Sequence, residues 1–284
     1  MTITAWCRRL VFLAYAGFVA LASTVWLLIS AHPAVRESES SLKEAKRQPQ
    51  GAVFRELLRV PAVRLILLMS IGIFFFNHGL NNWLPEILRS SGMSVEAAGI
   101  WSAMPVAIGI VSAVLVSRLA VPRRRYLVML CSLLCGMVAS LLLQSGALPI
   151  VTLGLVLQGI GQSTLMIVAV LILVEQPEVG ARRAGTAGGL FFAAAEIGGV
   201  LGPLSLGVVF DVTGGFSTSL AGLTLVMVML VLLLLRLQSV APVSIARGQL
   251  PRLRHVWPPQ HLPLRNAGRP GPHEARCRPS RPDA

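Results

Sequence analysis

The side chains best suited to contact a polar solute stand inside apolar stretches of the sequence. One cluster lies at the end of the stretch 65–84 and consists of Asn77, His78, Asn81 and Asn82. In a helix, the four-residue spacing places Asn77 over Asn81, and the same spacing separates the other two residues. Amide and imidazole groups form hydrogen bonds, and a neutral imidazole also exchanges protons near neutral pH. Two interpretations remain open: contact with a solute, or a helix end that surfaces among lipid headgroups.

A second pair of polar side chains, Gln158 and Gln162, lies in the stretch 149–174. The two residues are one helical turn apart and therefore share a helix face. They either face the same solute-binding cavity or join one helix to another, as amides do inside membrane proteins.

Glu196 is a carboxylate inside the otherwise mostly apolar stretch 184–210. An ionised carboxylate in mid-membrane costs at least ~2.5 to 3.5 kcal/mol on insertion scales, so this residue must face water, have a partner or be protonated. One interpretation is an acid that takes part in proton coupling or in solute contact. The other is a carboxyl group that is hydrogen-bonded to a neighbouring helix or lies near the cytoplasmic end of its span. An anionic solute would be repelled by the bare charge, so its binding would require protonation.

Small residues recur every four positions around this acid, at Ala195, Gly199, Pro203 and Gly207. Such a stripe lets a neighbouring helix pack at short distance, and packing alone is enough to explain it. Pro203 also removes one helical hydrogen bond, which predicts a bend near Gly199.

The composition places the chain in a membrane. Hydrophobic residues make up 54% of the 284 residues, charged residues only 13%, and the mean hydropathy is +0.71, which is too apolar for a soluble globular domain. Seven stretches are long enough to span a bilayer: 10–30, 65–84, 97–117, 126–145, 149–174, 184–210 and 217–236. Lipid offers no partner to backbone polar groups, and the runs are too long for barrel strands. We therefore expect an all-α membrane protein with seven transmembrane helices.

Connections rich in Lys and Arg alternate along the chain with connections that are nearly free of them. They gather in three connections, 31–64, 118–125 and 175–183. The other connections between spans carry only Arg89. By the positive-inside rule, the basic connections and the tail after Arg236 lie in the cytoplasm, and the N-terminus lies outside. Arg8 and Arg9 do not follow this rule.

The sequence lacks the signatures of several other classes of protein. The net charge of +13 lies mainly in the basic connections and the tail, where insertion bias and anionic lipid account for it, so we expect no nucleic-acid partner. The four cysteines form no disulfide framework, and no cluster with metal-ligand spacing appears, so we expect no metal and no cofactor. No nucleophile and base stand in a catalytic pattern, which makes an integral-membrane enzyme the least favoured class.

An amphipathic segment, FRELLRVPAVR, begins at residue 54 and precedes six closely spaced spans. On a helix, its apolar face would hold Phe54, Leu57, Leu58 and Val60. Its polar face would hold Arg55, Glu56 and Arg59.

Three segments of the sequence resemble the major facilitator superfamily. Residues 175–216 read EQPEVGARRAGTAGGLFFAAAEIGGVLGPLSLGVVFDVTGGF, and residues 77–105 read NHGLNNWLPEILRSSGMSVEAAGIWSAMP. The first resembles the connection after the tenth helix together with the eleventh helix, and the second resembles the seventh and eighth helices of the cyanate permease-like branch. AWCRRLVFLAYAGFVALASTVWLLIS, at 5–30, resembles the sixth helix. The resemblance covers residues 5–238 and makes the seven spans equivalent to helices six to twelve.

The segment SRLAVPRRR, at 117–125, resembles the second copy of the superfamily's loop motif. The resemblance makes four residues candidate members of this motif: Arg118, Arg123, Arg124 and Arg125. The superfamily pattern has an acidic residue followed by Arg, where this chain has Val121 and Pro122. This departure weakens the expectation of a charge-relay gate in this loop.

The resemblance divides the chain into four regions. They are a helix like the last one of an N-terminal half (1–30), a central cytoplasmic loop with the amphipathic segment (31–64), a six-helix C-terminal half (65–238) and a Pro/Arg-rich disordered tail (239–284).

The resemblance also implies a function, the transport of a small polar or anionic solute, with or without a proton. In such transporters the solute lies near the middle of the bilayer between two halves that rock against each other. This favours solute contact for the cluster that begins at Asn77. Because the chain resembles little more than one half, we expect an incomplete transporter of a bacterial inner membrane that pairs with an N-terminal half or with itself. The alternative is a non-transporting membrane scaffold or regulatory protein derived from a decayed half.

Overall fold

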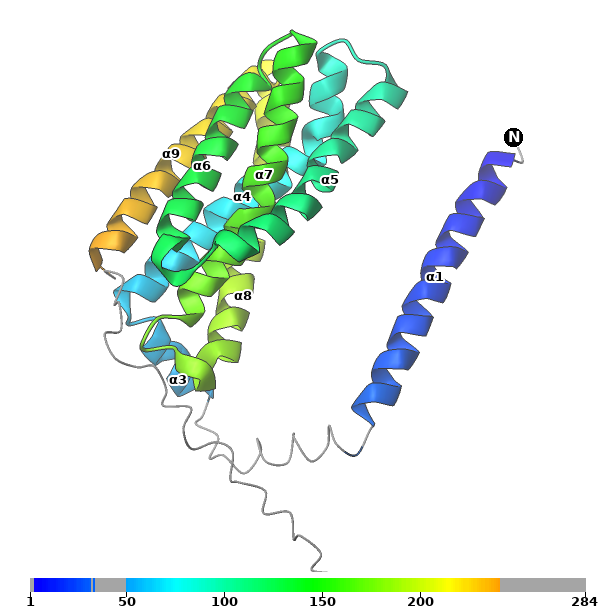
Figure 1. The fold of residues 1–284 in the computed structure, drawn as a ribbon. Coiled ribbons are helices and arrows are strands. Elements are labelled where there is room, and N and C mark those ends of the chain that lie inside the picture. Colours follow the sequence, from blue (N-terminus) through cyan, green and yellow to red (C-terminus); the bar gives the residue numbers. More distant parts are fainter. Residues whose placement is uncertain (1–2, 32, 34–49, 241–284) are drawn as a thin grey trace, which may run out of the picture. The chain divides into compact units, whose positions relative to one another are not determined.

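The computed structural model describes residues 3–31, 33 and 50–240, which form eight α-helices and one short 3-10 helix. The helices are α1 (Ile3–Ser30), α3 (Gln50–Leu57), α4 (Pro61–Ser90), α5 (Val95–Leu119), η1 (Pro122–Arg124), α6 (Arg125–Leu142), α7 (Leu148–Val174), α8 (Gly180–Thr213) and α9 (Ser217–Val240) (Figure 1). These residues contain no strand, so the expected all-α class is confirmed. The predicted disordered tail, apart from its first two residues, and most of the segment 31–49 lie outside the described residues.

Seven of these helices are long and apolar enough to cross a membrane, which confirms the seven predicted spans. The helix α4 is longer than the apolar stretch 65–84 that predicted it, because it begins at Pro61 and continues through Pro85 to Ser90. The polar cluster of Asn77 to Asn82 is therefore followed by about two further helical turns. This cluster lies within a helix and not at its end.

The helix boundaries have local causes in the sequence. Pro61 begins α4, where its missing N–H costs no hydrogen bond. Ser94 caps α5, since its side-chain oxygen accepts a hydrogen bond of 3.2 Å from the backbone N–H of Ala97. Gly214 ends α8 in the left-handed conformation, with φ of 70°, a backbone geometry that glycine adopts without strain.

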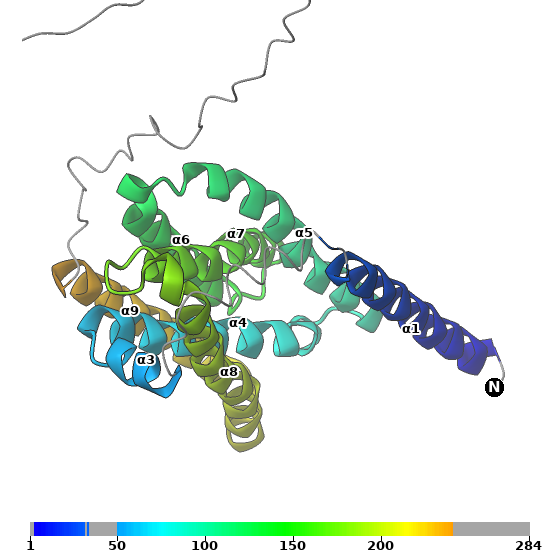
Figure 2. The same ribbon diagram turned by 90° about the horizontal axis from the view of Figure 1, so that it is seen from below.

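The helix α4 forms the centre of the bundle. It packs against α5, α7, α8 and α9. Of its 18 most apolar consecutive residues, 61% are buried, which is more than in any other described span. Figures 1 and 2 show α4 between these helices, with α7 and α8 on different sides of it. A polar side chain on α4 can therefore meet several neighbouring helices.

The closest approach between helices joins α8 to α4. A Cβ atom on Gly198 would overlap the carbonyl oxygen of Ile71, and one on Gly202 would overlap the carbonyl oxygen of Phe75. The predicted small-residue stripe does face α4, because Gly199 and Gly207 lie against side chains of that helix. The tightest contact is nevertheless one position earlier than predicted, since the exact rotation of α8 depends on how the two helices interlock.

The amphipathic segment begins in α3 and continues through the turn before α4, and its apolar residues face two different environments. Leu57 is fully buried and packs with the bundle core, whereas Phe54 and Leu58 are 39% and 43% exposed. The buried side is completed by Val53, which the pattern did not include. Contact with α8 decides which side of this short helix is covered.

Candidate functional site

The first part of the site is a pair of amides on α4. The side-chain nitrogen of Asn81 donates a hydrogen bond of 3.1 Å to the side-chain oxygen of Asn77. Both side chains are partly buried. The four-residue spacing thus places the two amides in direct contact, as the sequence predicts.

The amide pair continues across to α7. The side-chain nitrogen of Gln158 donates to the side-chain oxygen of Asn81 at 3.2 Å, and to the side-chain oxygen of Gln162 at 3.5 Å. The amides of Asn77, Asn81, Gln158 and Gln162 therefore form one continuous chain of hydrogen bonds, which we call the amide chain. Residues of the two clusters that the sequence predicts separately therefore belong to a single polar structure.

Gln158 is the most deeply placed member of the amide chain. Its side chain has no solvent exposure, and its side-chain oxygen finds no hydrogen-bond partner among the described residues. A buried carbonyl oxygen without a donor costs free energy, so this atom calls for a water molecule or a solute group that donates to it. At the two ends of the chain, the NH₂ groups of Asn77 and Gln162 keep donors that the amide chain does not use.

The other two predicted members, His78 and Asn82, do not join the amide chain. The Asn82 side chain is exposed and donates to the backbone oxygen of His78 at 2.8 Å. The His78 ring stacks on Phe74 with ring centroids 5.3 Å apart. His78 and Asn82 are therefore in contact, but only through the backbone oxygen of His78.

Glu196 lies on α8 close to His78. Its Oε2 atom is 3.3 Å from the position that a Cβ on Gly199 would occupy, and Cδ2 of His78 is 3.7 Å from the same position. The carboxylate and the imidazole are thus neighbours across a residue without a side chain. Within the described residues, Glu196 is exposed and forms no hydrogen bond or ion pair, and it lies about halfway along its span.

An aromatic cluster lies beyond the amide chain on α4. The indole N–H of Trp83 donates a 2.9 Å hydrogen bond to the backbone oxygen of Pro203 on α8. The ring packs against Phe210 and Phe216, with centroids 6.2 and 5.7 Å away, and covers Gly207. Trp83 therefore serves as a packing residue that joins α4 to α8 and to the start of α9.

The basic loop between α5 and α6 contains one ion pair that the sequence did not predict. Arg125 pairs with the carboxylate of Glu175, which follows the end of α7, and its Nε donates to the backbone oxygen of Ala120 at 3.0 Å. A carboxylate directly after a predicted span, on the same predicted side as the basic loop, was the signal for this pair.

The other arginines of this loop have different positions. Arg118 and Arg124 are exposed, and the side chain of Arg123 lies outside the described part of the structure.

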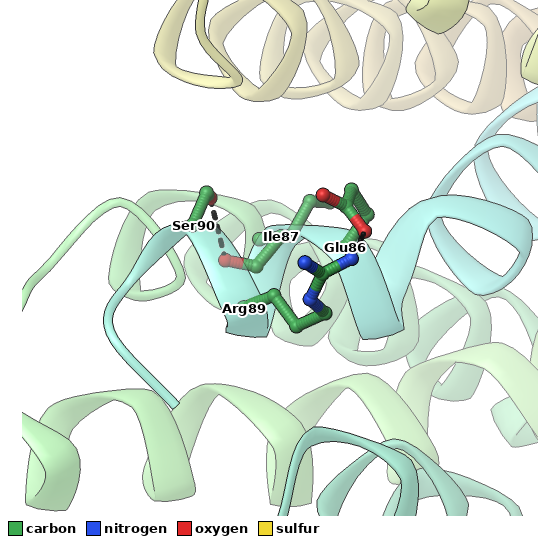
Figure 3. Close-up of polar contacts among 4 residues, drawn as sticks. All are labelled: Glu86, Ile87, Arg89 and Ser90. Carbon is green, nitrogen blue, oxygen red and sulfur yellow. Dashed lines mark hydrogen bonds and ion pairs between the residues drawn. The ribbon is translucent and has the colours of Figure 1, made fainter. Parts of the chain in front are cut away.

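At the far end of α4, Arg89 forms a local ion pair of 2.8 Å with Glu86, next to a hydrogen bond from Ser90 to the backbone oxygen of Ile87 (Figure 3). Among the residues that the structure describes, no group of three or more His, Cys, Asp and Glu side chains could hold a metal ion.

Seven apolar helices and a polar chain buried between two of them define a class, a multi-pass integral membrane protein with polar groups inside its bundle. The family model of the Major Facilitator Superfamily matches residues 2–203, which is most of the chain. The chain therefore belongs to the Major Facilitator Superfamily, a family of transporters. The match includes α4, α5, α6, α7 and most of α8, and thus every residue of the amide chain together with Glu196. Among curated proteins, none matches the chain significantly.

Proposed function

We propose that the helices α4 to α9 form one wall of the pathway of a secondary transporter for a small polar or anionic solute. The observation that carries this proposal is the amide chain, which joins α4 to α7 and leaves polar atoms without a partner in the described residues. Membership of the superfamily supports transport as the kind of function. Residues 77–105 resemble the cyanate permease-like branch, and this favours a solute about as small as cyanate, carried across a bacterial inner membrane.

The proposal includes a role for Glu196 in proton coupling. A carboxylate in the middle of a span must face water, find a partner or take up a proton. Glu196 has no partner among the described residues, and His78 lies beside it across Gly199. Protonation of Glu196 would remove a charge that repels an anionic solute, so proton uptake would accompany solute binding.

The opposite wall of the pathway would come from an N-terminal six-helix half or from a second copy of this chain. Transporters of this kind hold the solute between two halves near the middle of the bilayer. Exposed polar groups such as Asn82 and Glu196 would then face the partner half or the pathway and not lipid.

Thiol accessibility tests whether the amide chain lines an aqueous pathway. In a chain whose native cysteines are replaced by serine, Asn81→Cys and Gln162→Cys should each react with a small water-soluble thiol reagent. Leu232→Cys is the control, because Leu232 is 58% exposed on α9 and should face lipid. Equal reaction at all three positions, or reaction at the control alone, would contradict the proposal.

Uptake by proteoliposomes tests transport itself, with cyanate, acetate and glycerol as probes. Gln158→Leu should lower uptake roughly tenfold, because one lost hydrogen bond of about 1.4 kcal/mol changes an equilibrium constant by that factor. Gln144→Leu is the matched control, since the side chain of Gln144, in the turn after α6, donates only to the backbone oxygen of Ser140. The assay uses the chain alone and the chain co-expressed with an N-terminal half. If neither preparation moves any of the probes, the proposed function fails for these solutes.

A further inference from the structure

The position of α3 is determined by the spanning helix that follows it. The helix α3 ends at Leu57 and α4 begins at Pro61, and the three residues between them span about 10 Å at most. These residues also continue the turn, because the N–H of Leu58 bonds the backbone oxygen of Phe54 at 3.0 Å. Figure 1 shows α3 beside the beginnings of α4 and α8. If α4 crosses the membrane, α3 must therefore lie at the membrane surface.

One side of α3 is already occupied by the bundle. Val53 and Leu57 are 7% and 0% exposed and belong to the hydrophobic core. Glu56 forms an ion pair of 3.0 Å with Arg183 at the beginning of α8. The docking of α3 therefore neutralises the only carboxylate of this helix.

The remaining side carries two parallel ridges. Phe54 and Leu58, one helical turn apart, are 39% and 43% exposed. Arg55 and Arg59, also one turn apart, are exposed, and neither forms an ion pair with another described residue. Leu58 and Arg59 lie in the turn that directly follows α3, and we call these four residues the α3 outer surface. An apolar ridge beside a cationic ridge is the pattern of helices that lie in a membrane interface.

We propose that the α3 outer surface binds the anionic headgroups of phospholipids. Phe54 and Leu58 enter the boundary between headgroups and acyl chains, and Arg55 and Arg59 contact the phosphates. The charge of the surface matches this partner, because its two arginines have no carboxylate partner among the described residues while Glu56 is taken by Arg183. The inference does not depend on transport, since it uses only the position, exposure and charge of α3.

Lipid retention measured by native mass spectrometry tests the proposal. The full chain is released from micelles that contain equal amounts of phosphatidylglycerol and phosphatidylcholine. R55Q/R59Q should weaken the retention of phosphatidylglycerol by roughly fivefold for each arginine and leave that of phosphatidylcholine unchanged. R89Q is the matched control, because Arg89 is an exposed arginine of α4 that already has a partner in Glu86 (Figure 3).

A second variant separates insertion from charge. F54S/L58S keeps every charge and alters only exposed side chains, so it should fold and should weaken the retention of both lipids. Unchanged circular dichroism confirms the fold of each variant. Equal phosphatidylglycerol retention by wild type, R55Q/R59Q and R89Q would overturn the proposal, as would equal retention of the two lipids by wild type.

Discussion

At the scale of single residues, neutral amides supply the polar contacts between α4 and α7. Two asparagines and two glutamines bond one another, so this partly buried site avoids the large cost of an unpaired charge in a membrane. An amide has both N–H donors and a carbonyl acceptor. The donors and acceptors that the amide chain does not use can therefore form hydrogen bonds with a solute that carries acceptors or donors. The chemistry of this site therefore favours a small solute that forms several hydrogen bonds.

Glu196→Gln should remove the pH dependence of transport. If Glu196 must be protonated before an anionic solute binds, uptake by the unchanged chain falls as pH rises, by at most tenfold per pH unit for one proton. Glutamine is neutral at every pH and imitates the protonated acid, so the variant should keep binding at high pH and lose the dependence. Cyanate uptake measured between acidic and alkaline pH checks this expectation.

Asp211→Asn is the control for this prediction. Asp211 is an exposed acid of the same helix, α8, but lies near its other end and not beside His78. The role of Glu196 would be refuted if both variants kept the pH profile of the unchanged chain. His78→Gln tests the neighbouring imidazole in the same assay.

At the scale of elements, the contact between α4 and α8 depends on glycines. The backbones approach so closely at Gly198 and Gly202 that even one methyl group would overlap a carbonyl oxygen. Trp83 adds a hydrogen bond to the backbone of Pro203 farther along the same pair of helices. Because close packing drives association inside a membrane, where lipid is as apolar as the side chains, this contact is central to the stability of the bundle.

Gly198→Ala should lower the free energy of unfolding by about 1 to 3 kcal/mol, because the two helices must separate to admit the methyl group. Gly189→Ala is the matched control on the same helix, since no atom lies within 4 Å of its Cβ position. That change should leave stability unaltered or raise it by up to about 1 kcal/mol. Thermal unfolding in detergent compares the two, and an equal effect of both would show that close packing is not the cause.

At the scale of the whole molecule, the distribution of positive charge predicts the orientation in the membrane. The basic connections alternate with connections that are nearly free of Lys and Arg, so the loop between α5 and α6 should be cytoplasmic. The ion pair of Arg125 with Glu175 agrees with this arrangement, because it brings the end of α7 to the same side as that loop.

Labelling of intact cells checks this orientation. In the cysteine-free chain, Gly146→Cys should react with a membrane-impermeant maleimide from outside, and Arg124→Cys should react only after the cells are permeabilised. Both original residues are exposed, so access to reagent depends on the side of the membrane and not on burial. The opposite pattern would invert the orientation and place α3 at the outer surface.

The sequence by itself determined the class of fold and the contacts that run along a single helix. Long apolar stretches require helices in a bilayer, and the 3.6-residue period places side chains four apart in contact, as in the pair Asn77 and Asn81. Only the tertiary structure decided which helices meet and how each one is rotated. It joined Gln158 to Asn81, moved the closest packing to Gly198 and Gly202, and divided the apolar residues of α3 between the bundle and the surface. These outcomes depend on the interlocking of side chains from distant parts of the chain, which the periodicity of one helix does not contain.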